Sequence, residues 1–316
     1  MKDELKERYP AYVPGHYRLF TKIRKVMRQA SVRRAESQAR TTPPSGILPD
    51  GPAVWTPGPS SVIPNPKQAM NKGAFWMEED LADAKIGSIV EAIEELKKHL
   101  KEKDLRYTNT AATFLPRMFY PRSERTKLWE NAWSVYGSGV RSGDRILDVG
   151  GASTPFSFYL AELGCDVSVL DNDWGNCGTI YNANYVARKM GWKLKAFDAD
   201  IAKRFPFQDG AFDKVFSICT IEHLSSPVRR FMMAEVGRVL RPGGIAAITM
   251  CYDMNSKELL VDQGLRFGYR EKFYKDVVEP SGLSIYGNAD WMDFQESGFL
   301  GALFLIKPDG EKSHGR

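Results

Sequence analysis

The spacing of hydrophobic residues changes near residue 145. Before that point, apolar residues recur at helical spacing over residues 78–103 and again over residues 123–138, which predicts two helices. After it, short apolar runs alternate with helical stretches up to about residue 308. Strands separated by helices are typical of right-handed βαβ units, so this pattern predicts a parallel sheet covered by helices.

Seven short apolar runs read as strands of this sheet. The last two runs could pair with each other and close the sheet in an antiparallel arrangement. The runs are RILDVG, DVSVLD, KLKAFDAD, KVFSIC and IAAITMC, followed by LSIYG and ALFLIK.

The chain ahead of the sheet has a different character. Residues 1–45 hold eleven Lys/Arg and four Asp/Glu, although the net charge of the whole chain is only +5. Residues 17–30 form a basic amphipathic pattern, and this helix could lie on an anionic membrane, on nucleic acid, on its own domain or on a twin subunit. Residues 41–66 contain prolines too frequently for a helix or a strand and predict an extended arm.

These changes divide the chain into four parts. We expect a basic helix and proline-rich arm over residues 1–75, a helical preface or lid over 76–140, the sheet domain over 141–308 and a polar tail over 309–316. The arm offers a route to a homo-oligomer.

Composition excludes several classes of protein. The chain of 316 residues is 43% apolar and 26% charged, and no stretch approaches the roughly 20 apolar residues that span a bilayer. The N-terminal residues lack the apolar core of a signal peptide, so we expect a cytoplasmic protein. The four cysteines show no C-x-x-C spacing, which favours reduced thiols and no metal site.

The stretch ILDVGGASTPF, residues 146–156, is a buried strand followed by a glycine turn and a helix start. Asp148 sits at the carboxyl end of the strand, where open α/β sheets bind ligands. Gly150 and Gly151 let the backbone turn and leave room for a ligand. Thr154 is placed as a helix N-cap, with Pro155 at the first helical position.

The turn keeps two glycines of the G-x-G-x-x-G dinucleotide pattern, and the next strand ends in Asp171. An acidic side chain about 20 residues after such a turn can accept hydrogen bonds from both ribose hydroxyls. Because the phosphate cradle is incomplete, adenosine without phosphates is favoured over a pyrophosphate ligand. The alternative is a Rossmann-like sheet whose turn and acidic residue bind nothing.

Five motifs in order resemble the class I S-adenosylmethionine-dependent methyltransferases, over about residues 122–308. The resemblance implies an α/β, Rossmann-like, seven-stranded and mostly parallel sheet with an antiparallel last strand and helices on both faces, preceded here by the helical and proline-rich extension. The motifs are RILDVGGAS, DVSVLDND, AFDADI, FPFQDGAFDKVFSICTIEHL and VGRVLRPGGIAAIT. The RPGG segment itself reads as a turn that stops a helix and starts the fifth strand.

The resemblance also implies roles for individual residues. Asp148 and the glycines would surround the methionine and ribose end of S-adenosylmethionine, and Asp171 would hold the ribose hydroxyls. Asp200, with Ile201 beside the adenine ring, or its rival Asp198, would receive the adenine amino group. The residues expected around the cofactor are Asp148, Gly150, Gly151, Ala152, Asp171, Asn172, Asp198, Asp200, Ile201, Ser217, Cys219 and Arg125.

The chain departs from the family in the glycine turn. Where the family often has D-x-G-x-G-x-G, this chain has Ala152 and Thr154 at the later glycine positions. These replacements affect how the turn would hold the methionine end of S-adenosylmethionine. Arg122 or Arg125 could pair with the cofactor carboxylate in compensation, although both could instead belong to a solvated helix face.

Methyl transfer from a sulfonium is an in-line displacement, and a hydroxyl acceptor must also lose a proton. His223 follows the fourth strand and titrates near neutral pH, so it is the candidate general base; it could equally be a packing residue. Aromatic residues in segments 251–270 and 287–297 could line a substrate pocket, or lie in the core or an interface. They are Tyr252, Phe267, Tyr269, Trp291 and Phe294.

We therefore expect an S-adenosylmethionine-dependent methyltransferase that yields S-adenosylhomocysteine. Its expected substrate is a small molecule or a sugar-containing metabolite, methylated on oxygen. N-methylation or methylation of RNA is an alternative, although no basic and aromatic stripe of the type that binds nucleic acid stands out. A further alternative is a protein of this fold that binds the cofactor or a partner without catalysis.

Overall fold

The computed structural model describes residues 70–71, 80–108, 125–151, 153–172, 178–250, 273–288 and 301–309. All of them belong to the unit Ser61–Arg316, the larger of two into which the chain divides. The basic helix expected at 17–30 and the proline-rich arm lie outside these residues. The expected segment 251–270 and most of segment 287–297 do so as well.

The described residues form a seven-stranded sheet in the order β3-β2-β1-β4-β5-β7-β6. Strands β1 to β5 are parallel, whereas β7 runs antiparallel to both β5 and β6. The expected fold class, including the antiparallel pair at the end, is confirmed. The strands are β1 Arg145–Val149, β2 Asp166–Asp171, β3 Leu194–Asp198, β4 Phe212–Ile218, β5 Leu240–Met250, β6 Ser284–Ile285 and β7 Gly301–Ile306.

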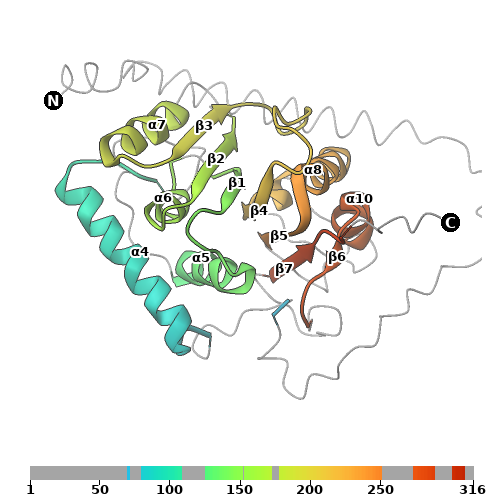
Figure 1. Ribbon diagram of the computed structural model, residues 1–316, viewed down its shortest axis with the longest axis horizontal. Coiled ribbons are helices and arrows are strands. Elements are labelled where there is room, and N and C mark those ends of the chain that lie inside the picture. The colour runs from blue at the N-terminus through green and yellow to red at the C-terminus, as the bar shows by residue number, and fades with distance from the viewer. Residues whose placement is uncertain are drawn as a thin grey trace, which may run out of the picture. The chain divides into compact units, whose positions relative to one another are not determined.

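Helices cover both faces of the sheet (Figure 1). One apolar core holds Phe216 of β4 together with residues of the first four helices, and a second core on the other face holds Val215 with residues of the later helices. Because neighbouring residues of β4 point to opposite faces, both cores meet in this central strand. The helices are α4 Ala84–Glu102, α5 Arg125–Ser138, α6 Pro155–Glu162, α7 Thr179–Met190, η3 Ile221–His223, α8 Ser226–Val239, η4 Tyr274–Val278 and α10 Glu279–Ser281.

The two helices predicted ahead of the sheet are present as α4 and α5. Asp83 caps α4, because its carboxylate accepts hydrogen bonds from the backbone N–H groups of Lys85 and Ile86. Helix α4 buries the apolar stripe expected from its sequence, and α5 packs against β5, β7 and β4. Helix α5 therefore brings its side chains close to the centre of the sheet.

The RPGG segment lies within β5, which is a correction to its interpretation as a turn before the strand. Helix α8 does end at Val239, and β5 is continuous from Leu240. Along the pairing with β4, the three residues from Phe212 to Lys214 face the six residues from Leu240 to Ile245. The extra residues form an irregularity of the strand, which the two glycines tolerate.

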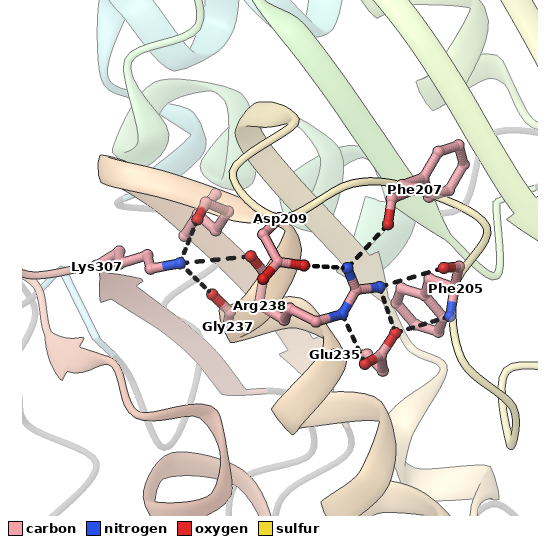
Figure 2. Close-up of polar contacts among 8 residues, drawn as sticks. Phe205, Phe207, Asp209, Glu235, Gly237, Arg238 and Lys307 are labelled. Carbon is pink, nitrogen blue, oxygen red and sulfur yellow. Dashed lines mark hydrogen bonds and ion pairs between the residues drawn. The ribbon is translucent and has the colours of Figure 1, made fainter.

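The amino ends of β4 and β5 are joined by a dense polar network (Figure 2). Arg238, the penultimate residue of α8, donates hydrogen bonds to Glu235, to Asp209 at 2.7 Å and to the backbone oxygens of Phe205 and Phe207. Glu235 also accepts a 2.7 Å hydrogen bond from the N–H of Phe205. This network holds the segment between β3 and β4 against α8.

Two further charged groups complete this edge. Lys307, directly after β7, donates hydrogen bonds to the backbone oxygens of Gly237 at 2.8 Å and Leu240 at 2.7 Å. Asp213 accepts hydrogen bonds from Arg145 and Arg241 at the first or second position of their strands. Charged side chains thus fasten four strands at the edge opposite the carboxyl ends of β1 to β5.

Asn71 fastens the start of the described chain to the last two strands. Its side-chain amide donates hydrogen bonds to the backbone oxygens of Tyr286 and Asn288, and its side-chain oxygen accepts one from the N–H of Phe304 at 2.6 Å. Asn71 is fully buried. Trp133 of α5 donates a 3.0 Å hydrogen bond to the neighbouring backbone oxygen of Met70.

Candidate functional site

The expected ligand residues gather at the carboxyl ends of β1 to β4. Asp148 lies opposite Phe216 of β4 in the sheet register, and Asp171 at the end of β2 lies opposite Asp198 at the end of β3. Parallel strands place their carboxyl ends along one edge of a sheet, which is where open α/β sheets bind ligands. Residues from four separate stretches of sequence therefore share one edge.

Asp148 is a fully buried carboxylate with one oxygen left unused. Its Oδ2 accepts a 2.5 Å hydrogen bond from the hydroxyl of Ser157 on α6. Its Oδ1 has no hydrogen-bond partner within the described part of the chain. Burial raises the pKa of Asp148 to about 7, and the Ser157 hydrogen bond opposes that rise. A cationic ligand group would supply the missing partner.

The turn after β1 has room for no side chain at either glycine. A Cβ on Gly150 would collide with Thr220, and one on Gly151 would collide with the carboxylate of Asp148. Gly150 also has a φ of +89°, in the left-handed region that glycine tolerates. The predicted need for these two glycines is thus explained. Ala152 lies outside the described residues.

Thr154 occupies the predicted N-cap position of α6, with Pro155 next to it, but its side chain makes no capping hydrogen bond. The Thr154 hydroxyl instead lies 3.3 Å from the hydroxyl of Ser157. Ser157 is also the donor to Asp148. Thr154 therefore contacts the serine that binds the buried carboxylate. This is a correction to its expected role as a helix cap.

Side chains brace the turn where the family often has further glycines. Ser153 donates a 2.7 Å hydrogen bond to the backbone oxygen of Thr179. Asn182 of α7 donates to the Ser153 hydroxyl at 3.1 Å and to the backbone oxygen of Arg106 at 2.8 Å. The N–H of Thr108 donates to the backbone oxygen of Ser153. The segment after α4 is therefore part of the support of this turn.

The acidic residues proposed for the adenosine half differ in their surroundings. The Oδ1 of Asp171 accepts a 2.6 Å hydrogen bond from the N–H of the next residue, Asn172. Asp198 is exposed at the end of β3. Asp200 caps its own turn, since its Oδ1 accepts a 2.9 Å hydrogen bond from the N–H of Ala202, and half-buried Ile201 lies beside it. Which of Asp198 and Asp200 meets adenine stays open.

The residues expected after β4 also lie at this edge. Ser217 is buried, and its hydroxyl has no hydrogen-bond partner among the residues described. Cys219 has a φ of +49°, which is rare for a residue other than glycine. His223 ends the short helix η3, and its pKa is lowered by burial and then by the charge of Lys127. Its role as a base stays a prediction.

Sequence reasoning missed a buried carboxylate on α5. Glu130 is fully buried, and its Oε1 accepts hydrogen bonds from the thiol of Cys219 at 2.5 Å and the hydroxyl of Thr249 at 2.9 Å. Its Oε2 lies 2.9 Å from the ammonium of Lys127. The available signal was a Glu within the apolar stretch LWENAW. Arg125, the residue expected to reach the cofactor, is exposed at the start of the same helix.

The residues proposed to line the substrate pocket, Tyr252, Phe267, Tyr269, Trp291 and Phe294, lie outside the described residues, as does Arg122. In the described part of the chain, no cluster of His, Cys, Asp and Glu is suited to hold a metal ion. None of the described helices is both long and apolar enough to cross a bilayer.

Comparisons with known proteins agree with the motifs. The family model described as "Methyltransferase domain" matches residues 146–244, from β1 into β5. The sterol 24-C-methyltransferase of Saccharomyces cerevisiae is 31% identical over 155 residues, which are 46% of this chain and 39% of that protein. The demethylmenaquinone methyltransferase of Beutenbergia cavernae is 34% identical over 119 residues, 37% of this chain and 45% of that protein.

The name of a third relative refers to RNA instead of a small molecule. The "Probable tRNA methyltransferase 9B" of Mus musculus is 29% identical over 161 residues, 49% of this chain and 30% of that protein. The chain thus spans less than half the length of each of these relatives. The family model itself matches the part that carries the glycine turn after β1 and the end of β2. Over residues 146–244 the chain is therefore similar to methyltransferases, a family whose methyl donor is S-adenosylmethionine.

Proposed function

We propose that the protein transfers a methyl group from S-adenosylmethionine to a small molecule, with an oxygen atom as the acceptor. The observation that supports this most strongly is the buried Oδ1 of Asp148, which lacks a partner among the described residues at the carboxyl edge of the sheet. A buried carboxylate of this kind is costly unless a cation or a hydrogen-bond donor meets it. The cofactor brings both an ammonium group and a sulfonium.

The described residues fit the two halves of the cofactor. Asp148 and the narrow turn at Gly150 and Gly151 suit the methionine end, because a Cβ on Gly151 would collide with the carboxylate and one on Gly150 would collide with Thr220. Asp171 suits the ribose hydroxyls, since its carboxylate ends the strand next to β1. When bound, the cofactor supplies an electrophilic methyl group. The protein has to orient the acceptor and remove its proton.

His223 is the proposed base. Burial, and then the charge of Lys127, lower its pKa below the ordinary value of 6.5, so the imidazole is neutral at pH 7 and able to accept a proton. It follows β4 at the same edge as Asp148. A neutral imidazole near the acceptor would take the hydroxyl proton as the oxygen attacks the methyl carbon.

The first experiment separates catalysis from mere binding. Titration calorimetry with S-adenosylmethionine and S-adenosylhomocysteine should give binding that Asp171→Ala abolishes or weakens at least tenfold, as expected for the loss of two hydrogen bonds to a carboxylate. Equally tight binding by the parent protein and by Asp171→Ala would overturn the assignment of the cofactor site. Binding without any methyl transfer to acceptors would favour the non-catalytic alternative.

The second experiment addresses the acceptor. Transfer of labelled methyl from S-adenosylmethionine is measured with panels of hydroxylated small molecules, sterols, quinols and total tRNA, and the product's methylated atom is located by NMR. A methylated oxygen is expected, with His223→Gln lowering kcat about a hundredfold or more at unchanged cofactor affinity. A methylated carbon or nitrogen, or transfer to tRNA alone, would replace this part of the proposal. Full turnover by His223→Gln would exclude it as the base.

A further inference from the structure

We propose that Glu130 is a positioning residue of the cofactor site, which holds Cys219 as a neutral thiol donor and fixes the end of β4 against the glycine turn. The inference rests on the cofactor site described above, but its main test needs no cofactor. Glu130 belongs to helix α5, ahead of the matched methyltransferase residues 146–244.

Three groups converge on the carboxylate. The thiol of Cys219 and the hydroxyl of Thr249 donate to Oε1 at 2.5 and 2.9 Å, and the ammonium of Lys127 lies 2.9 Å from Oε2. Cys219 and Thr249 stand after the end of β4 and near the end of β5, 89 and 119 residues from Glu130. One helical side chain therefore ties together two adjacent strand ends at the ligand edge.

The contacts explain the unusual backbone of Cys219. Its φ of +49° carries a cost for a residue with a side chain, and such a conformation persists only where neighbours impose it. The N–H of Cys219 donates to the backbone oxygen of Thr249 at 3.0 Å, and its thiol is held by Glu130. The backbone N–H of Cys219 is thus held by Thr249 and its thiol by Glu130, and Glu130 also binds Thr249.

The next residue transmits this position to the cofactor turn. Thr220 donates to the backbone oxygen of Val149 at 3.4 Å, and its side chain fills the space that a Cβ on Gly150 would need. The side chain of Thr220 therefore packs directly against Gly150. Because Cys219 is covalently joined to Thr220, a carboxylate on α5 sets the distance between the end of β4 and the turn after β1.

The charges around Cys219 indicate that Glu130 controls the ionisation of this thiol. On α5, the Glu130 carboxylate opposes formation of a thiolate, whereas Lys127 favours it. Burial lowers the pKa of Lys127, but Glu130 and then Cys219 outweigh burial and raise it, so the ammonium stays charged. Strand β5 contributes only the neutral Thr249, and His223 of η3 is neutral at pH 7 because its pKa is lowered. Glu130 is therefore proposed to keep Cys219 as a thiol, which donates a hydrogen bond to the carboxylate.

The test compares the alkylation rate of Cys219 by iodoacetamide as a function of pH, followed by peptide mass spectrometry without cofactor. Glu130→Gln removes the negative charge and leaves Lys127, so the thiol should ionise at lower pH and react about tenfold faster at pH 7. Lys127→Met should have the opposite effect, with about tenfold slower reaction. A merely structural Glu130 would not move the two profiles in opposite directions.

Cofactor affinity supplies the second measurement. Glu130→Gln should weaken binding of S-adenosylhomocysteine about tenfold, whereas Glu235→Gln, at the far edge of the sheet, should lower stability and leave affinity unchanged. If Glu130→Gln does not fold, Lys127→Met decides by its alkylation profile. An unchanged or slower alkylation in folded Glu130→Gln, or faster alkylation in Lys127→Met, would overturn the proposal even if the cofactor still binds. Normal alkylation shifts in a protein that binds no cofactor would instead count against the proposed function.

Discussion

At the amino edge of the sheet, charged side chains pair with one another and with backbone oxygens, whereas at the carboxyl edge two buried polar atoms lack partners among the described residues. Arg238 donates to two carboxylates and two backbone oxygens (Figure 2). At the opposite edge, Asp148 Oδ1 and the Ser217 hydroxyl are buried and lack partners among the described residues. Because buried polar groups in proteins usually have hydrogen-bond partners, we expect a ligand to supply the missing partners at the carboxyl edge.

The pKa values follow the same division. At the amino edge, the hydrogen bond from Arg238 lowers the pKa of Glu235. For Asp213, burial acts to raise the pKa, but hydrogen bonds from Arg241 and Arg145 outweigh it and lower the value to about 2. At the carboxyl edge, burial raises the pKa of Asp148 to about 7. The amino edge stabilises its carboxylates as anions, whereas burial at the carboxyl edge destabilises the anion of Asp148, which a cationic ligand would stabilise.

The strongest way to break this comparison is Arg238→Ala. The change leaves Glu235, whose side chain is only 10% exposed, without its cation, and it releases the backbone oxygens of Phe205 and Phe207. We expect a loss of about 3 kcal/mol in the free energy of unfolding, measured by urea denaturation. The cofactor affinity of the folded fraction should stay unchanged. A parallel loss of affinity would mean that the two edges are not independent.

Asp148→Asn should act in the opposite sense. Loss of the carboxylate removes a charge-assisted contact to the cofactor, and affinity for S-adenosylmethionine should fall about tenfold or more in calorimetry. At pH 8, however, the cofactor-free variant should be more stable than the parent by about 1 kcal/mol, because no buried anion has to be formed. A variant that is both less stable and normal in binding would contradict the role given to this carboxylate.

The sign of that stability change follows from linkage. The folded-state pKa of Asp148 lies above its ordinary value of 3.8, so folding favours the protonated form. The resulting stabilisation is complete at low pH and is lost as the pH rises to about 7. Cofactor binding should show the reverse dependence, losing up to tenfold in affinity for each pH unit below 7 as protons compete for the carboxylate. Calorimetry in buffers of different ionisation enthalpy would detect the released proton, and a flat profile would exclude it.

The smallest expected effect belongs to Asp213→Asn. The pKa of this carboxyl is below its ordinary value of 3.8, so the contribution to stability is present above that value and is lost as the pH falls toward 2. Because its partners are half-exposed, we expect only about 1 kcal/mol at pH 7. Acid unfolding of the parent and the variant should converge near pH 2. A difference that persists there would assign the effect to packing.

The sheet could be predicted because its cause is local. Apolar runs of strand length, separated by apolar residues at helical spacing, specify the strands and helices. Gly150 and Gly151 mark the turn after β1, and the tight contacts there explain why both residues are glycine. The acidic residues at 148 and 171 could be found because both lie at the carboxyl end of a strand. For the strands and for Gly151, whose Cβ would meet Asp148, the signal and the structural reason lie within a few residues of each other, whereas Gly150 is confined by the distant Thr220.

The missed features depend on partners far away in the sequence. Lys127 and Glu130, three residues apart on a helix, look like a solvated pair until Thr249 and Cys219 are brought against them. The expected capping bond of Thr154 failed for a different, local reason, because its hydroxyl lies against that of Ser157, the donor to Asp148. Side-chain chemistry at a site is decided by what the fold brings near, and a single sequence carries little record of it.

Asn71 has a consequence for the order in which the protein forms during synthesis. Its partner in β7, the N–H of Phe304, follows it by 233 residues, so at about 5–20 residues per second the ribosome delivers the two ends of this hydrogen bond roughly 10–50 seconds apart. The five parallel strands can pair in that interval, whereas the side chain of Asn71 has to wait for Tyr286, Asn288 and Phe304 before all of its hydrogen bonds can form. We therefore expect the contacts of Asn71 with β6 and β7 to form after the pairing of the parallel strands.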